Sequence, residues 1–287
     1  TKNFDPFKIM AIFFVVVLGA PHPQIPLPAA LLGPQRVNSR GMDLSDEATL
    51  ASLQRALQAG TQTLARAPLM LATTPRGPRP WGEVLNPALH SDRVGEVQWA
   101  QTDDVSAAVA DATHAATVWA QVAPAERAAC LARAADAMQA HEADFMGLLM
   151  REAGKTAANA VAEIREAIDF LRDYGGQVAR HFDPDRHLPL GPVVCISPWN
   201  FPLAIFTGQI AAALAAGNPV LAKPAEQTPL VAAQAVALLH AAGVPRAALQ
   251  LLHGDGHIGA ALVADERVQG VVFTGSTEVA KRIQGQL

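Results

Sequence analysis

The chain has 287 residues, enough for one large domain or two small ones, and 50% of them are hydrophobic while 17% are charged. This composition is typical of a globular protein and excludes disordered and collagen-like classes. The net charge is -4 and no run of lysine or arginine exceeds two residues, so we expect no nucleic-acid surface. Two cysteines, Cys130 and Cys195, cannot build a disulfide framework and favour a reducing, cytoplasmic compartment.

Residues 1–36 form a leader that is apolar and then proline-rich. Its apolar run, residues 9–20, is shorter than the roughly twenty residues that span a membrane. The run follows Lys8 as in a signal peptide, but nothing else in the chain has an extracellular character. We therefore interpret it as a cloning or truncation artefact, or as a stray strand, and expect no membrane span.

Residues 37–92 are predicted to hold one helix and an extended linker. Leucines in helical register place the helix at 46–65. Pro75, Pro78 and Pro80 predict that the connector at 67–87 contains no regular element. Residues 93–190 then carry three apolar stripes with a helical period. The expected helices are 103–121, 124 to Gly154, and 156–175.

From residue 191 onward, short apolar runs alternate with helical patterns. Four such runs are followed by helices after short connections, which predicts an α/β fold with a Rossmann-like, doubly wound parallel sheet over 191–287. The expected strands are 192–196, 219–222, 249–252 and 270–273. In such sheets the ligand lies beyond the carboxyl ends of the strands, so the loops that follow the strands are the candidate site.

Three of these loops carry groups suited to a dinucleotide. Gly254-Asp255-Gly256-His257-Ile258-Gly259 matches G-x-G-x-x-G between a strand and a helix, although the usual acidic partner further on is missing. Lys223 and Glu226 follow the preceding strand, and such a pair can hold a ribose. Thr274-Gly275-Ser276 begins a helix and can offer backbone N–H groups to a pyrophosphate. An ordinary helix cap explains this last motif equally well.

Taken together, these loops resemble those of the aldehyde dehydrogenase superfamily. The resemblance rests on Gly191-Pro192-Val193-Val194 through Pro198-Trp199-Asn200-Phe201-Pro202, on Lys223-Pro224-Ala225-Glu226-Gln227-Thr228-Pro229 and on Phe273-Thr274-Gly275-Ser276-Thr277-Glu278-Val279-Ala280. It covers residues 84–287. Residues 33–44 also resemble the linker before the dehydrogenase half of bifunctional proline-utilisation enzymes, and residues 166–171 resemble the branch that oxidises L-glutamate γ-semialdehyde.

The resemblance implies a role for each matching residue. Asn200 would stabilise the oxyanion that forms when a cysteine thiolate attacks the aldehyde. Glu166 and Phe201 would lie beside the substrate. NAD is implied rather than NADP because the carboxylate of Glu226 would repel a 2′-phosphate. The expected cofactor contacts are Ile196, Ser197, Pro198, Trp199, Lys223, Glu226, Gly256, Gly275 and Ser276. A small aldehyde substrate and a homo-oligomeric full-length parent are implied as well.

In this family the general-base glutamate and the nucleophilic cysteine lie downstream of the Thr-Gly-Ser loop, and this sequence ends before either. We therefore expect the chain to be a fragment of an NAD-dependent aldehyde dehydrogenase, with the catalytic domain absent. The alternatives are a nucleotide-binding remnant without turnover and a non-catalytic interaction module. Binding of the cofactor would favour the enzyme fragment and the nucleotide-binding remnant over the interaction module.

Two further groups of residues are interpreted as structural. His253 and His257 flank a turn, and we expect a solvated loop there rather than a metal site. The charged residues of the helical region are expected to form solvated helix faces. This group comprises Glu152, Lys155, Glu163, Arg165 and Glu166.

Overall fold

The computed structural model describes residues 24–27, 30–33, 36–60 and 63–286. Two compact units are present, one ending at Asn38 and a larger one that begins at Ser39. The apolar run at 9–20, interpreted above as an artefact or a stray strand, lies outside the described residues. No helix among those that are described is long and apolar enough to cross a membrane.

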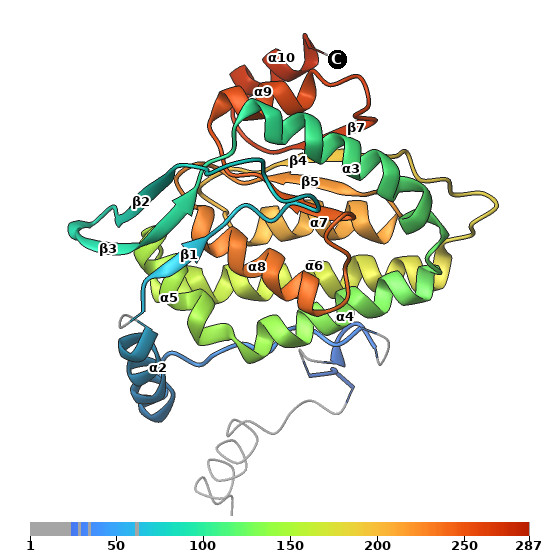
Figure 1. Cartoon of the computed structure of the whole chain (residues 1–287). Helices are drawn as coiled ribbons and strands as arrows, with labels where there is room; N and C mark the ends of the chain where they lie inside the picture. The colour runs from blue at the N-terminus through green and yellow to red at the C-terminus, as the bar shows by residue number, and fades with distance from the viewer. Residues whose placement is uncertain (1–23, 28–29, 34–35, 61–62, 287) are drawn as a thin grey trace, which may run out of the picture. The chain divides into compact units, whose positions relative to one another are not determined.

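A four-stranded parallel sheet forms the centre of the larger unit (Figure 1). Its order is β6 (Leu249–Leu251), β5 (Val220–Lys223), β4 (Val193–Ile196) and β7 (Gly270–Phe273). The chain builds outward from β4 to β6 and then returns to the other side of β4 to form β7. This reversal next to β4 is the kind of switch point where ligands bind in open α/β sheets. The predicted Rossmann-like parallel sheet is confirmed.

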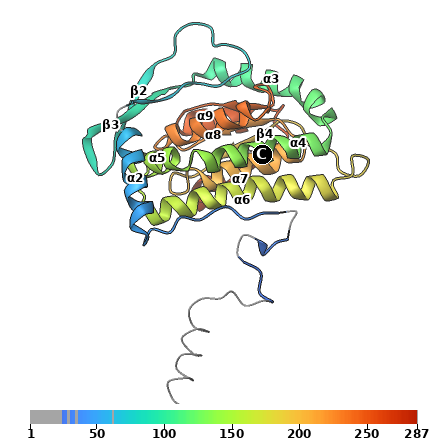
Figure 2. The same ribbon diagram turned by 90° about the horizontal axis from the view of Figure 1, so that it is seen from below.

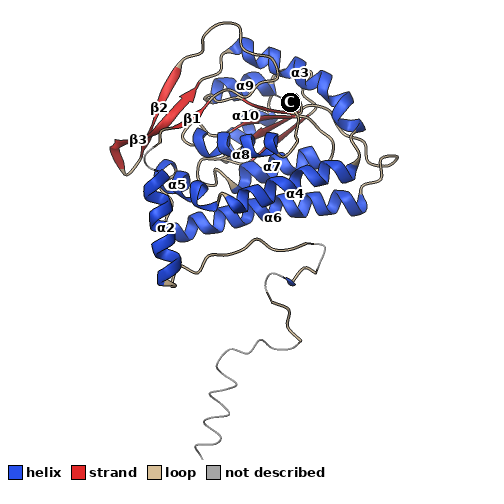
Figure 3. Ribbon diagram, turned by 60° about the horizontal axis from the view of Figure 1, so that its bottom comes forward, coloured by secondary structure: helices blue, strands red, loops and turns tan. Residues whose placement is uncertain are grey.

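Helices cover both faces of this sheet (Figures 1 and 3). α3 (Thr102–Gln121) and α9 (Gly256–Val263) pack on one face, while α7 (Ala204–Ala215) and α8 (Pro229–Ala241) pack on the other. Successive strand side chains enter different hydrophobic cores, as strand geometry requires. The strands therefore read as continuous apolar runs, which is typical of a parallel sheet buried on both faces.

An outer layer of helices packs against α7 and α8 (Figure 2). It consists of α4 (Pro124–Ala140), α5 (Glu142–Glu152) and α6 (Ala157–His181). The single helix predicted from residue 124 to Gly154 was wrong, because the chain breaks at His141 into α4 and α5. The end predicted for α6 was also wrong. Gly175 does not stop that helix; a Cβ there would lie 3.3 Å from the Ala128 carbonyl oxygen, so the glycine allows α4 and α6 to pack closely.

A second, three-stranded sheet lies at one end of the larger unit (Figure 3). Its strands are β1 (Ala65–Ala67), β2 (Trp81–Asn86) and β3 (Leu89–Gln98), in the order β1-β3-β2. The expectation of no regular element over 67–87 was wrong, since β2 begins directly after Pro80. Proline is compatible with the residue that precedes an edge strand, and β2 is such an edge.

The two remaining helices lie near the ends of the described chain. α2 (Glu47–Gly60) is shorter than predicted, and of its leucines only Leu53 is fully buried while Leu50 is exposed. α10 (Thr277–Gln284) follows β7 as predicted. It has no fully buried residue, so its side chains remain available to the space beyond the strand ends.

Candidate cofactor-binding site

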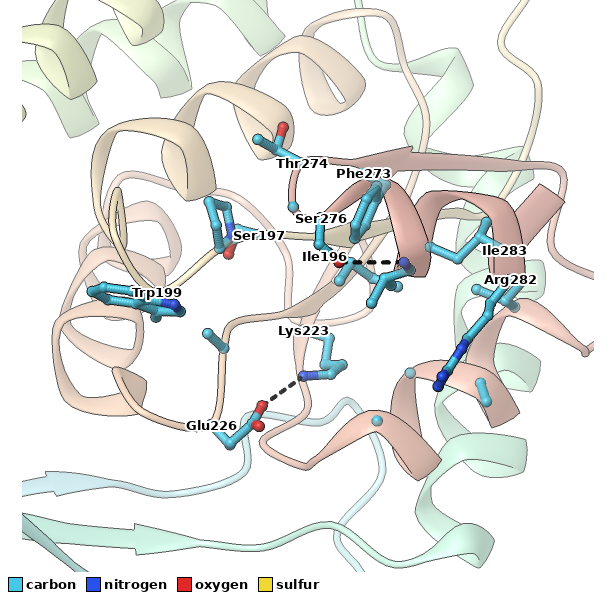
Figure 4. A pocket seen from close by; sticks show the side chains of 18 of the residues that line it. Ile196, Ser197, Trp199, Lys223, Glu226, Phe273, Thr274, Ser276, Arg282 and Ile283 are labelled. Atoms are coloured by element: carbon cyan, nitrogen blue, oxygen red, sulfur yellow. Dashed lines mark hydrogen bonds and ion pairs between the residues drawn. The ribbon is translucent and has the colours of Figure 1, made fainter.

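The loops that follow β4, β5 and β7, together with α9 and α10, line one cavity of about 1390 Å³ (Figure 4). The cavity lies at the carboxyl ends of the parallel strands, where the sequence predicted a site. Glu166 is the one predicted site residue that does not line it. The predicted residues that do are Ile196, Ser197, Pro198, Trp199, Asn200, Phe201, Lys223, Glu226, Gly256, Gly275 and Ser276.

Lys223 is the most deeply placed cation of the cavity, with only 4% of its surface exposed. Its Nζ donates hydrogen bonds to the carbonyl oxygens of Pro224, at 2.9 Å, and Gly254, at 2.8 Å. Burial lowers the pKa of this ammonium, while the charges of Glu226 and Asp255 oppose that shift. The Glu226 carboxylate lies 4.0 Å from Nζ and points toward it (Figure 4). A hydroxyl group can therefore accept from Lys223 and donate to Glu226.

Glycines of α9 give the cavity its shape. A Cβ at Gly259 would lie 3.3 Å from the Cδ and Cε atoms of Lys223. The absence of a side chain at Gly259 therefore leaves room for the Lys223 side chain to lie against α9. At Gly256, the first residue of α9, a Cβ would meet nothing within 4 Å. The side chain of Asp255 caps α9 by accepting from the His257 N–H at 2.9 Å. At Gly256 the first turn of α9 therefore leaves open space in the cavity.

The ends of β4 and β7 are tied together by Gln209 of α7. Its Nε2 donates to the Ile196 carbonyl oxygen at 3.3 Å and to Thr274 Oγ1 at 3.1 Å. The Thr274 N–H also donates to Ile196 at 3.1 Å. Sequence reasoning missed Gln209, although an amide in a helix otherwise buried on all sides is a signal that could have found it.

Ser276 caps the N-terminus of α10, and its Oγ accepts from the Val279 N–H at 3.3 Å. The cap hypothesis for Ser276 therefore holds in this structure, and it is compatible with a ligand on the free N–H groups of the first turn. Gly275 precedes it in a sharp turn, where a Cβ would lie 2.5 Å from the Phe273 ring. Val279 and Ile283 continue the wall of the cavity along α10.

The β4–α7 loop forms the opposite wall. Trp199 and Phe201 are exposed to 58% and 44%, and both line the cavity. Asn200 lies between them with its side chain exposed. Asn200 therefore lines this wall of the cavity, and Figure 4 shows its neighbour Trp199 on the side away from α10.

Three side chains predicted to be solvated are buried. His253 is 1% exposed, and burial lowers its pKa to about 3, so the imidazole is neutral beside Lys223. Glu152 and Glu163 are 3% and 2% exposed. Each accepts hydrogen bonds from two backbone N–H groups at the start of a helix, Glu152 at α8 and Glu163 at α7. These predictions were wrong because each partner lies far away in the sequence.

Neither cysteine reaches the cavity. Cys195 lies inside β4, fully buried, and burial raises the pKa of its thiol. Cys130 is buried on α4, where burial also raises the pKa of its thiol and the nearby Arg133 opposes that shift. Within the part of the chain that the structure describes, no group of three metal-ligating side chains is present. The geometry suits ligand binding more than covalent chemistry by these two thiols.

Comparison with known proteins gives a consistent result. A model of the aldehyde dehydrogenase family matches residues 75–287. The bifunctional protein PutA of Klebsiella aerogenes is 57% identical over 267 residues, which cover 93% of this chain and 20% of that protein. The 1-pyrroline-5-carboxylate dehydrogenase of Geobacillus kaustophilus is 39% identical over 212 residues, which cover 69% of this chain and 41% of that enzyme.

Solved structures agree with these matches. A 1-pyrroline-5-carboxylate dehydrogenase from Thermus with bound NAD superposes with a TM-score of 0.81 at 31% identity, over 87% of this chain and 51% of that one. The chain spans about a fifth of the length of the PutA proteins that it matches. The loops that line the cavity and the family model that covers most of the sequence lead to one conclusion: the chain belongs to the aldehyde dehydrogenase family.

Proposed function

We propose that this chain is the cofactor-binding part of an NAD-dependent aldehyde dehydrogenase that oxidises L-glutamate γ-semialdehyde to L-glutamate in proline catabolism. The observation that carries the proposal is the meeting of three strand-end loops and two helix starts at one cavity, with Lys223 and Glu226 facing each other there. Lys223 and Glu226 suit a ribose and the start of α10 suits an anion, so the cavity contains both kinds of contact that a dinucleotide requires.

Lys223 and Glu226 suit the adenosine ribose. Two N–H groups of Lys223 are held by backbone carbonyls, which directs the third toward the cavity. A ribose hydroxyl placed between Nζ and the carboxylate would accept from one and donate to the other. Because both partners are charged, these hydrogen bonds are stronger than those between neutral groups.

The first turn of α10 suits the pyrophosphate. Its free N–H groups and the positive end of the helix dipole favour an anion, and Gly275 removes any side chain from the approach. At the start of α9, which the Asp255 side chain already caps, Gly256 leaves open space for a ligand. The residues present therefore fit a dinucleotide between α9 and α10.

We assign the side-chain amide of Asn200 to the carbonyl oxygen of the aldehyde. When bound, NAD would supply the hydride acceptor for oxidation of the aldehyde. The Asn200 side-chain amide would donate a hydrogen bond to the oxygen that becomes negative when a thiolate adds to the aldehyde. Ser197 and Trp199 would enclose this end of the cavity and restrict water.

The covalent step is assigned to a cysteine outside these 287 residues. A nucleophilic cysteine needs an accessible sulfur and a lowered pKa, whereas the thiols of Cys130 and Cys195 are buried with raised pKa values. The choice of L-glutamate γ-semialdehyde rests on the relatives, whose names specify proline utilisation or 1-pyrroline-5-carboxylate.

Isothermal titration of the purified chain with NAD tests the proposal. We expect one site per chain. Glu226→Gln should weaken binding about ten- to hundredfold, because a hydrogen bond to a charged group contributes roughly 1.5–3 kcal/mol and each 1.4 kcal/mol is tenfold. Glu266→Gln is the matched control, since Glu266 is exposed and lies away from the cavity.

NAD binding that is weakened in Glu226→Gln and unchanged in Glu266→Gln supports the cofactor site. Binding without NADH formation from the aldehyde is expected for this chain by itself. Absence of NAD binding in the unaltered chain would contradict the proposal and favour an interaction module.

A further inference from the structure

Lys155 lies at the turn between α5 and α6 and reaches the loop that carries Asn200. Its Nζ donates to the main-chain carbonyl oxygen of Asn200 at 2.6 Å. The same ammonium lies 4.6 Å from the centre of the Phe201 ring, within range of a cation–π interaction. One cation from the helical region thus contacts two successive residues of the cavity wall.

The backbone of Lys155 is itself fixed. Gly154 adopts φ +65°, a conformation that glycine takes without strain, and this turns the chain sharply between the two helices. The Lys155 N–H donates to the Leu149 carbonyl oxygen at 3.1 Å. The side chain of Thr156 then caps α6 by accepting from the Asn159 N–H at 3.2 Å. These contacts fix the backbone from which the lysine side chain reaches both Glu163 of α6 and the β4–α7 loop.

Glu163 holds the ammonium from the other side. Its Oε1 lies 2.9 Å from Lys155 Nζ, and its Oε2 accepts from the N–H groups of Leu203 and Ala204, at 3.3 and 3.0 Å. The Lys155 and Glu163 side chains are only 14% and 2% exposed. A shielded ion pair with additional hydrogen bonds has a defined geometry that exposed pairs lack. The start of α7 and the Asn200 carbonyl are therefore bound to the same pair.

We propose that Lys155 is a positioning residue that fixes the main chain of Asn200, so that the Asn200 amide is held ready at the cavity wall before any ligand arrives. The inference rests on the proposed function, because it concerns the residue assigned there to the oxyanion. Preorganised donors stabilise developing charge without reorganisation, so their backbone must be held rigidly. The Lys155 hydrogen bond supplies that restraint at 199–201, the exposed stretch of the loop.

Four variants separate positioning from general stability. Lys155→Met removes the ammonium, and Lys155→Arg retains a cation that can donate to Asn200. Lys155→Met combined with Glu163→Gln avoids leaving a buried carboxylate without its cation. Arg172→Met is the control, because Arg172 is a cation of α6 with the same 14% side-chain exposure that pairs with Asp136 and not with this loop.

The main readout is backbone ¹⁵N relaxation of the full chain, with unfolding by urea as the stability measurement. We expect the heteronuclear NOE of Asn200 to fall from values typical of ordered backbone to values typical of a flexible loop in Lys155→Met and in the double variant. It should recover in Lys155→Arg and stay unchanged in Arg172→Met, while the α7 amides remain ordered throughout. An unchanged Asn200 in the double variant, or an equal loss of order in Arg172→Met, would overturn the proposal.

Ligand titrations keep this result distinct from the proposed function. The double variant should bind NAD about three- to tenfold more weakly, because the loop that carries Asn200 is proposed to enclose the nicotinamide, whereas Lys223 and Glu226 are proposed to hold the adenosine ribose. Its affinity for AMP, which reaches only the adenosine end, should not change. Equal weakening of both ligands would contradict a local role for Lys155. If the unaltered chain binds neither ligand, the cofactor assignment fails, and the relaxation data still decide whether Lys155 orders Asn200.

Discussion

At the level of single residues, we expect the negative charge of Glu226 to decide which dinucleotide binds in the cavity. The Glu226 carboxylate lies at the place proposed for the ribose, where NADP would carry its 2′-phosphate. Glu226→Gln should therefore narrow the preference for NAD over NADP by at least about tenfold, because it removes a like-charge repulsion. The ratio of the two dissociation constants measures this effect. A ratio as large in Glu226→Gln as in the unaltered chain would show that another group discriminates between the cofactors.

Residues of the cavity could be predicted from the sequence where they directly follow parallel strands, because the loops after such strands meet at one edge of the sheet. Lys223, Glu226 and Ser276 follow three different strands, and all three line the same cavity. The rule says nothing about side chains that arrive from elsewhere. Lys155 was interpreted as part of a solvated helix face and Gln209 was missed, because their partners in the loops depend on how the helices pack against the sheet and against one another.

At the scale of single elements, Gln209 joins α7 to the ends of two strands. We expect Gln209→Leu to lower the free energy of unfolding by about 1–2 kcal/mol, because the Ile196 carbonyl and the Thr274 hydroxyl each lose a hydrogen bond. NAD affinity should fall severalfold as the two loops separate. Chemical denaturation and titration measure the two effects. Gln234→Leu on α8, outside the cavity, is the control, and equal effects in both variants would contradict the role of Gln209.

Glu152 joins α5 to α8 and should make stability depend on pH. Burial raises its pKa to about 8 from an ordinary value of 4.5, while the hydrogen bonds from Leu230 and Val231 oppose the shift. Between these two values the folded chain retains a proton that the unfolded chain has released. The contribution of Glu152 to the free energy of unfolding therefore falls as pH rises from about 4.5 to 8.

Glu152→Gln tests this dependence because glutamine imitates the protonated carboxyl group and does not titrate. At pH 5 the variant should be less stable by about 1 kcal/mol, since its amide nitrogen cannot accept one of the two backbone N–H groups. Each pH unit between 4.5 and 8 lowers the stability of the unaltered chain by about 1.4 kcal/mol, so the difference should vanish within about one pH unit and then reverse. Urea unfolding at several pH values measures it, and a variant that remains less stable than the unaltered chain at pH 8 would contradict the raised pKa.

The same elements explain why some boundaries were predicted and others were not. The β–α alternation after residue 191 was read correctly because apolar runs and capping residues carry that signal locally. Pro80 was interpreted as a breaker, although it stands directly before β2, and Gly175 was interpreted as a stop, although it allows α4 and α6 to approach. Both residues act through neighbours that are distant in sequence.

At the scale of the larger unit, the sheet separates two hydrophobic cores, with the outer helices on one side and α3 and α9 on the other. The cavity opens where both layers end, at the carboxyl edge of β4, β5 and β7. Lys155 and Glu163 connect the helical region to that edge at the β4–α7 loop, which gives this region a part in the site as well as in the core.

A crystal structure of the chain with NAD is the most direct test of whether this cavity binds the cofactor. The proposal predicts the adenosine ribose between Lys223 and Glu226, the pyrophosphate at the first turn of α10 beside Ser276, and the nicotinamide toward Asn200. A dinucleotide bound with its ribose away from Lys223 and Glu226, or bound outside this cavity, would contradict it.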